Sequence, residues 1–367
     1  ILAGNIMNKG GIAIRLINLA KIVTGRTPGG LAQTNILANA LFGAISGSGT
    51  AAASAMGSII GPIEKDEGYD PNFSAAANIA TAPTGLLIPP SNVMITFSLV
   101  SGGTSVAALF MAGYIPGALW ALACMLVVYI YAKKAGYRSQ TKLTGKEKFN
   151  AFIQALPCLL LIIIVIGGII AGVFTATEGS VVAVVYSLLL SIYGYKSMKW
   201  KDLPEIFRAS AEMTGIIIFL IGVSSIMSWV MAFTNIPTMV SNGLLSISSN
   251  KFVILLMINI ILLVVGTFMD MTPATLIFTP IFLPVCTALG MNTIHFGIML
   301  IFNLCIGTIT PPVGTTLFVG VKVGGVKIET VFKHLLPYFF AIIVVLMLVT
   351  YIPQLSLWLP GLMGYVS

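Results

Sequence analysis

The chain has 367 residues, of which 57% are hydrophobic and 8% are charged. Soluble domains carry about 25% charged residues, so this composition excludes a soluble globular protein and indicates an integral membrane protein. The net charge of +8 does not indicate nucleic-acid binding, because Lys and Arg in a membrane protein mark the cytoplasmic loops. Long apolar stretches, without the alternating segments of a barrel, predict an all-α fold; they lie at 156–174, 216–233, 252–269 and 339–352.

The first segment begins in an apolar pattern at Ile1 and continues as an amphipathic stretch at 12–23. Arg15, Asn18 and Lys21 share one face of that stretch, which predicts a helix lying along the membrane surface. Residues 234–245 correspond to it in the second half, and we expect a surface helix there as well. A counterpart of the helix expected at 209–235 would lie before Ile1, so the sequence predicts that the chain continues upstream.

Residues 28–60 form an apolar stretch that is interrupted by Ser-Gly-Ser-Gly at 46–49. This pattern predicts a re-entrant hairpin of two helices, followed by a cytoplasmic loop, Glu-Lys-Asp-Glu, at 64–67. The next span, at 72–100, contains Pro89 and Pro90, and proline breaks a helix because it removes a backbone donor. Backbone freed in this way is tolerated at membrane depth only where protein or a water-filled cavity satisfies it.

Two loops rich in Lys and Arg determine the expected orientation. The spans predicted at 149–172 and 180–195 lie between them, so both loops fall on one side, and the positive-inside rule makes that side the cytoplasm. The turn at 175–180 has no positive charge and is expected outside. The basic residues are Lys133, Lys134, Arg138, Lys142, Lys146 and Lys148 in the first loop, and Lys196, Lys199, Lys201 and Arg208 in the second.

The second half continues with a helix at 209–235 that runs outward and a segment at 236–250 on the outer surface. Residues 251–283 are long enough for two half-spans, and Met-Asp-Met-Thr-Pro at 269–273 interrupts them, which predicts a second re-entrant hairpin. A second broken span at 294–320 contains Pro311 and Pro312 and runs inward. The last span then leads outward again.

The breaks recur at a constant spacing along the chain. Pro62 matches Pro284, Gly85 matches Gly307, the prolines at 89–90 match those at 311–312, and the glycines at 102–103 match those at 324–325. The two halves begin on opposite faces, which predicts an inverted repeat with 1–135 and 209–367 as repeats and 136–208 as the link. Corresponding broken segments in two halves indicate the binding site of a secondary transporter.

Each hairpin tip, paired with the proline break of its own repeat, is expected to form one cation site. Freed carbonyls and helix C-termini are hard oxygen ligands with partial negative charge, which suits Na⁺. This predicts two Na⁺ sites or more. The residues expected to bind Na⁺ are Ser46, Gly85, Ile88 and Pro90 in the first repeat, and Gly266, Asp270, Thr308, Thr310 and Val313 in the second.

Hydroxyl and amide side chains at the same breaks are expected to face a polar cavity at the midplane. Helix N-termini direct backbone donors at anions, so this cavity suits a polar, anionic substrate. The residues expected to bind the substrate are Ser48, Thr50, Ser91, Asn92, Thr272 and Thr315.

Asp270 is the only carboxylate that the sequence places deep inside an apolar stretch, and acids inside a membrane are usually functional. The alternative is that Asp270 only caps the half-helix that begins near Thr272. His295 and His334 lie near helix ends and are expected to be interfacial. The cysteines stand singly in apolar surroundings and are expected to be core residues without a metal or redox role; they are Cys124, Cys158, Cys286 and Cys305.

Four motifs resemble the large membrane subunit of tripartite ATP-independent periplasmic (TRAP) transporters of bacteria and archaea. In chain order they are GSGTAAASAMG at 47–57, APTGLLIPPSN at 82–92, FMDMTPA at 268–274 and TPPVG at 310–314. The resemblance runs through the whole chain. It implies a Na⁺-driven importer of the bacterial inner membrane that works as an elevator, in which the hairpins and broken helices move past a scaffold of the remaining helices.

The resemblance also implies partners. A small four-helix membrane subunit, separate or fused upstream, would brace the scaffold, and a soluble periplasmic binding protein would deliver the substrate. Substrates of this family are mostly organic anions, namely sialic acids, C4-dicarboxylates and other carboxylated acids. The sequence Pro-Pro-Ser-Asn at 89–92 is similar to the sialic acid branch. Neither an enzymatic activity nor a nucleic-acid partner is expected.

Other interpretations remain open at this point. A stand-alone Na⁺/carboxylate symporter has similar paired hairpins, and a TRAP transporter for C4-dicarboxylates would differ in its substrate. An intramembrane serine protease would use Ser48 as its nucleophile, but it needs a histidine at the same depth. His295 and His334 lie near helix ends in the other half of the chain. A passive channel would share the broken helices without needing two hairpins.

Overall fold

The computed structural model describes residues 1–137, 144–248 and 250–365. All secondary-structure elements in these residues are helical, which confirms the predicted all-α fold. Within the same residues, six helices are long and apolar enough to cross a membrane, and the bent pair Pro71–Leu87 and Asn92–Val100 would make a seventh span. Arg138 and Lys142 of the first basic loop lie outside the described residues.

The helices of the first half contain the interruptions expected from the sequence. Pro83 adds a further irregularity that the sequence analysis did not predict, because it separates α5 from the single turn α6. In chain order the helices are α1 (Leu2–Lys9), α2 (Ile12–Thr24), α3 (Gly30–Ser46), α4 (Gly49–Asp66), α5 (Pro71–Thr81), α6 (Thr84–Leu87), α7 (Asn92–Val100) and α8 (Val106–Ala135).

The linking region and the second half follow the predicted order and add one helix, α18, after the last expected span. The spans of the linking region begin at capping boxes, in which Thr144 pairs with Glu147 and Thr175 pairs with Glu178. The elements are α9 (Gly145–Ile170), α10 (Ala176–Leu189), a π-helical turn (Leu190–Gly194), a 3₁₀ turn (Trp200–Asp202), α11 (Leu203–Phe233), α12 (Ile236–Ile247), α13 (Lys251–Gly266), α14 (Met271–Ala288), α15 (Thr293–Gly307), α16 (Thr315–Gly324), α17 (Ile328–Tyr351) and α18 (Gln354–Leu362).

The hairpin α3–α4 turns at two residues. Gly47 ends α3 with φ 62°, a left-handed conformation that favours glycine, and Ser48 is the N-cap of α4 and accepts a hydrogen bond from the amide of Ala51 at 3.3 Å. The turn therefore lies within the predicted break at 46–49. The second limb continues to Asp66, beyond the predicted end of the hairpin at residue 60.

Both broken spans stop at a pair of prolines. The peptide bonds Pro89–Pro90 and Pro311–Pro312 are both cis, and the chain resumes as α7 at Asn92 and as α16 at Thr315. The first break bends its span by 47°. The matched breaks agree with the repeat seen in the sequence, while the inverted relation between the two halves stays a prediction.

The core lies where the broken spans cross α8. Trp120 on α8 donates a hydrogen bond to the carbonyl of Ala80 at 2.9 Å, and its ring lies 4.7 Å from that of Phe302 on α15. Phe97 on α7 contacts Phe296 on α15 with ring centroids 6.1 Å apart. These aromatic side chains join the two halves of the chain, so the breaks are held against one another by a packed core.

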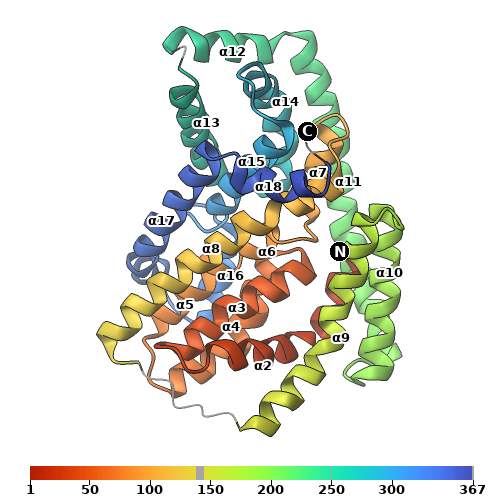
Figure 1. Ribbon diagram of the computed structural model, residues 1–367, viewed down its shortest axis with the longest axis vertical. Coiled ribbons are helices and arrows are strands. Elements are labelled where there is room, and N and C mark those ends of the chain that lie inside the picture. Colours follow the sequence, from red (N-terminus) through yellow and green to blue (C-terminus); the bar gives the residue numbers. More distant parts are fainter. Residues whose placement is uncertain (138–143, 249, 366–367) are drawn as a thin grey trace.

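Two helices, α2 and α12, lie crosswise to the long helices (Figure 1), and their location at the membrane surface stays a prediction. Figure 1 shows α12 across one end of the molecule, between α11 and α13, and α2 across the opposite part, below α3 and α4. Leu16 and Ile17 of α2 are fully buried because this helix packs against α3 and α9. Figure 1 also shows α3 and α4 in the lower half and α13 and α14 in the upper half.

Candidate functional site

The first hairpin tip lies on the break of its own repeat through a close contact between two glycines. A Cβ atom added to Gly85 would lie 2.1 Å from the Cα atom of Gly43, so neither backbone leaves room for a side chain. The side chain of Asn92, the first residue of α7, approaches the carbonyl oxygen of Gly47 at 3.5 Å. The contact between Gly43 and Gly85 brings the C-termini of α3 and α6 together. The C-terminus of a helix is the end that carries free carbonyl groups.

The second tip repeats this arrangement. A Cβ atom on Gly307 would lie 2.4 Å from the carbonyl carbon of Gly266, so the C-termini of α13 and α15 also meet backbone to backbone. The amide of Val313 donates to the carbonyl of Thr267 at 3.1 Å, which ties the break to the hairpin tip. Partial negative charge therefore gathers at two places in the molecule, one in each half.

Asp270 stands at the start of α14 in the N-cap position, but its side chain makes no capping hydrogen bond. The hydroxyl of Thr315, the first residue of α16, approaches a carboxylate oxygen of Asp270 at 3.5 Å. The side chain of Asp270 is exposed towards a cavity rather than buried. The alternative that Asp270 only caps this helix is therefore not seen in the structure, and the carboxylate is available to a ligand.

A cavity of about 220 Å³ lies between the two tips. It collects eight of the residues predicted from the sequence, of which three come from the first hairpin, one from α7 and four from the second hairpin and its break. They are Ser46, Ser48, Thr50, Asn92, Asp270, Thr272, Thr308 and Thr315.

Four half-helix N-termini open onto this cavity. Gly49 begins α4, Asn92 begins α7, Met271 begins α14 and Thr315 begins α16, and all of them line it. Each N-terminus carries unsatisfied N–H groups and about half a positive charge. No Lys or Arg is among the described residues that line the cavity. Backbone donors, hydroxyls and the side-chain amides of Asn5, Asn8 and Asn92 are therefore the groups that can hold an anion there.

Two helices outside the hairpins complete the cavity, and the sequence analysis did not predict their contribution. Asn5 and Asn8 of α1 and Met213 and Ile217 of α11 line the same space. Asn5 also donates a hydrogen bond to Ser210 of α11 at 2.9 Å, so α1 and α11 form one wall. The residues that these helices contribute are two amides and two apolar side chains, and they gave no signal without the tertiary structure.

The remaining predicted residues lie elsewhere. Gly85 and Gly266 are at the glycine contacts, and none of the described cavity linings near the tips includes Ile88, Thr310 or Val313. The hydroxyl of Thr310 donates to the carbonyl of Ile306 at 2.7 Å. As carbonyl ligands, these residues stay predictions.

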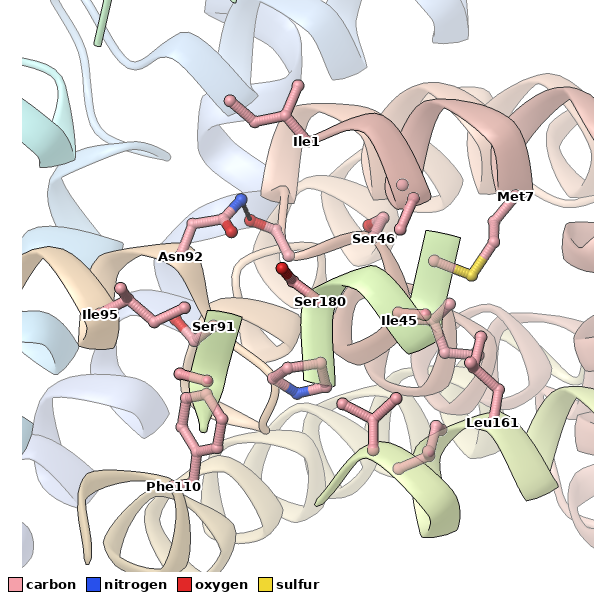
Figure 2. A pocket seen from close by; sticks show the side chains of 18 residues that line it. Ile1, Met7, Ile45, Ser46, Ser91, Asn92, Ile95, Phe110, Leu161 and Ser180 are labelled. Atoms are coloured by element: carbon pink, nitrogen blue, oxygen red, sulfur yellow. Dashed lines mark hydrogen bonds between the residues drawn. The ribbon is translucent and has the colours of Figure 1, made fainter. Parts of the chain in front are cut away.

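Ser91 and Pro90 line a second, smaller cavity of about 110 Å³, which is largely apolar. The side chain of Ser91 is fully buried, and its hydroxyl has no hydrogen-bond partner. Figure 2 shows that Asn92 on α7, Ser46 on α3 and Ser180 on α10 meet at this cavity from different helices. Ser91 therefore shares this cavity with Asn92, while the other residues predicted to bind the substrate line only the cavity between the tips.

Three further expectations can be compared with the structure. His295 is not interfacial: it is 3% exposed, and its Nε2 atom lies 2.8 Å from the carbonyl oxygen of Val349. His334 is partly exposed and lies 3.4 Å from the carboxylate of Asp70. Glu64 does not lie in a loop as predicted but in α4, where it is completely buried. All the predicted core cysteines are buried and free.

The comparisons with known proteins agree with one another. Residues 1–355 match the family model described as "Tripartite ATP-independent periplasmic transporter, DctM component". The chain is 55% identical to the uncharacterized protein YgiK of Salmonella typhimurium, over 99% of this chain and 83% of that protein. It is 36% identical to the sialic acid TRAP transporter large permease protein SiaM of Vibrio cholerae, over 100% and 86% of the two chains. It is 35% identical to the C4-dicarboxylate TRAP transporter large permease protein DctM of Rhodobacter capsulatus, over 99% of this chain and 86% of that protein.

Proposed function

The chain belongs to the DctM family, the large membrane subunits of tripartite ATP-independent periplasmic transporters, and from this premise we propose that it imports a small organic anion together with Na⁺. Membership makes it a multi-pass permease of the bacterial inner membrane, in agreement with its apolar helices. The relatives are permeases and not enzymes, so the intramembrane protease is rejected.

The observation that carries the anion proposal is the convergence of four helix N-termini on one cavity. Their combined partial charges favour a negative ligand, and the hydroxyls of Ser48, Thr50, Thr272 and Thr315 supply further donors. A carboxylate needs several such donors, since the described lining contains no guanidinium group to bind it in a bidentate way.

The paired helix C-termini support the Na⁺ part of the proposal. At each glycine contact, two helix ends with free carbonyls lie against each other. Carbonyl oxygens in such a cluster match the hard-oxygen preference of Na⁺. Ser46 in the first repeat, and Asp270 and Thr308 in the second, line the cavity beside these contacts. Na⁺ bound there would also reduce repulsion between the carboxylate of Asp270 and an anionic substrate.

An elevator movement accounts for the position of the cavity between different sets of helices. One wall is formed by the hairpins and broken spans, and the other by α1 and α11. In the proposed cycle, a periplasmic binding protein releases the anion into this cavity, and the hairpins and broken spans then carry it past α1 and α11. A small membrane subunit would hold the scaffold in place, because large subunits of this family work with both partners.

The substrate is proposed at the level of an organic anion with a carboxylate. Relatives named for sialic acid and for C4-dicarboxylates are 36% and 35% identical to this chain, so the overall likeness does not favour either. The sequence Pro-Pro-Ser-Asn at 89–92 places sialic acid first in the order of testing.

Transport by the reconstituted complex tests the proposal. The full-length chain and its small subunit would be placed in liposomes, and uptake of radiolabelled sialic acid and succinate measured with and without an inward Na⁺ gradient and the cognate binding protein. We expect uptake of one of them that needs both. Uptake that needs Na⁺ alone would indicate a stand-alone symporter, and uptake independent of Na⁺ would contradict the coupling.

A further inference from the structure

A third cavity, which is polar and has a volume of about 250 Å³, lies between α3, α4, α5 and α16. Its rim includes the exposed residues Pro62, Lys65 and Pro71, so it is accessible from outside the protein. Its inner wall is formed by the buried polar side chains of Glu64, Ser74, Asn35 and Asn78. Fifteen residues separate Glu64 from the start of α4 at the hairpin tip, which is about 22 Å along a helix. This cavity is therefore distinct from the one between the tips.

Glu64 is unusual among the polar residues of this cavity. Its side chain is 0% exposed, and neither carboxylate oxygen has a hydrogen-bond partner. The hydroxyl of Ser74 also lacks a partner. An ionised carboxylate that is buried alone costs several kcal/mol, because water no longer solvates it, so such a group binds either a proton or a cation. A bound cation would remove that cost, and an ionisable group inside a membrane protein indicates a functional site by default.

The amides beside Glu64 are held by other bonds, except for the Nδ2 atom of Asn35, which is buried without a hydrogen-bond partner. Asn39 donates to the side-chain oxygens of Asn35 at 2.7 Å and of Asn78 at 2.9 Å, and Asn78 donates to the carbonyl of Ala53 at 2.8 Å. This network makes a rigid polar wall, and a ligand site with a rigid wall loses little entropy when the ligand binds.

The repeat shows that the fold does not require these polar residues. At the spacing that relates Pro62 to Pro284, Glu64 corresponds to Cys286, and the other three residues of the inner wall also have apolar counterparts in the second half. The counterparts of Asn35, Ser74 and Asn78 are Met257, Phe296 and Leu300. The same architecture is thus built without a carboxylate in the second half, so the polar group in the first half needs a reason of its own.

We propose that Glu64 anchors a cation site in this cavity, which binds one alkali-metal cation, Na⁺ or K⁺, through the Glu64 carboxylate, the Ser74 hydroxyl and water. One carboxylate balances one positive charge. No group of three or more His, Cys, Asp and Glu side chains that could hold a metal occurs among the described residues, which disfavours a divalent or transition metal. A cavity of this volume also leaves room for several water ligands.

The other ionisable groups near Glu64 do not replace the cation. Glu67 adds a second negative charge at the end of α4, and Tyr69 and Tyr338 are neutral phenols on the segments that pack beside it. Lys65 lines the rim, but its side chain is exposed. The local charge is therefore negative, which favours a cation from solution.

Binding of radioactive sodium and rubidium, the latter as a substitute for K⁺, tests the site on the purified full-length protein with its small subunit. Glu64→Gln keeps the shape of the side chain and removes the charge. Glu67→Gln is the matched control, because it removes an exposed charge from the same helix end. We expect Glu64→Gln to lose one bound cation per chain and Glu67→Gln, which removes a nearby charge but no ligand, to keep the number of bound cations of the unmodified protein.

The isotope whose binding decreases in Glu64→Gln identifies the cation: a loss of sodium indicates a Na⁺ site, and a loss of rubidium indicates a K⁺ site. Unchanged binding of both by Glu64→Gln overturns the proposal. If Glu64→Gln fails to fold, as judged by gel filtration and thermal unfolding, Ser74→Ala is the second variant. Ser74→Ala is expected to shift one binding step to a severalfold higher cation concentration, and an unshifted curve would also overturn the site.

Discussion

Asp270 is the side chain in the cavity between the tips that carries a full charge. It occupies an N-cap position without capping the helix, and the hydroxyl of Thr315 lies 3.5 Å from it. A residue that served only as a cap would direct its oxygen at the backbone of its own helix. The geometry instead leaves the carboxylate free for a cation at the second hairpin tip.

Asp270→Asn is therefore expected to raise the Na⁺ concentration for half-maximal transport roughly tenfold, which corresponds to about 1.4 kcal/mol. The measurement is the Na⁺ dependence of uptake in proteoliposomes. Glu212→Gln is the control, because Glu212 is exposed and pairs with Arg208 at 2.9 Å on α11. An unchanged Na⁺ response of Asp270→Asn would show that this carboxylate takes no part in cation binding.

Each hairpin meets the broken span of its own repeat at glycine residues, because the space between the two helices admits only backbone atoms. At Gly85 a Cβ atom would lie 2.1 Å from the backbone of Gly43, and backbone cannot move aside as a flexible side chain can. A residue larger than glycine would push α6 away from the end of α3 and separate the helix C-termini that form the first proposed cation site.

Gly85→Ala is expected to destabilise the protein by about 1–3 kcal/mol and to abolish Na⁺-dependent uptake. Thermal unfolding and uptake of the purified variant would be measured together. Gly167→Ala on α9 is the matched control, because a Cβ atom there meets nothing within 4 Å. That control is expected to be as stable as the unmodified protein or up to about 1 kcal/mol more stable. A fully active Gly85→Ala would show that the close contact is not needed.

Movement of the hairpins relative to α11 can be tested by cross-linking. Met213 on α11 and Thr272 on α14 line the same cavity from opposite walls, and the four natural cysteines are buried. The double variant Met213→Cys with Thr272→Cys is expected to lose transport when a cysteine cross-linker is added. Transport by each single variant is measured before and after the same treatment, which separates the loss caused by replacing Thr272, a proposed substrate ligand, from the effect of the cross-link. Transport that continues in the cross-linked double variant would contradict the elevator movement.

At the scale of the whole molecule, the proposed cycle couples charge movement to the membrane potential. With two Na⁺ carried per singly charged anion, each cycle would move one net positive charge inward. Each Na⁺ gains about 2.3 kcal/mol from a potential of about 100 mV. An inside-negative potential, imposed by valinomycin and a K⁺ gradient, is therefore expected to increase the initial rate of uptake. A rate that does not depend on the potential would mean that the cycle is neutral and carries fewer cations.

Much of the architecture could be predicted because its signals are local. A long apolar stretch predicts a span wherever it lies, and Pro311 or Gly47 interrupts a helix through its own backbone chemistry. The hairpin break at 46–49 and the proline breaks therefore appear in the structure where the sequence placed them. The boundaries were less accurate: α4 continues to Asp66, because its last turns pack on α5 and α16.

The sequence alone determined that this is an α-helical membrane protein with matched breaks in its two halves, because hydropathy and backbone geometry belong to short segments. Only the tertiary structure decided which side chains meet. It brought Ser48 and Thr272 to one cavity with α1 and α11, and it buried Glu64 and His295, which the sequence placed near the surface. Burial and convergence depend on helices distant in the chain, so no local pattern contains them.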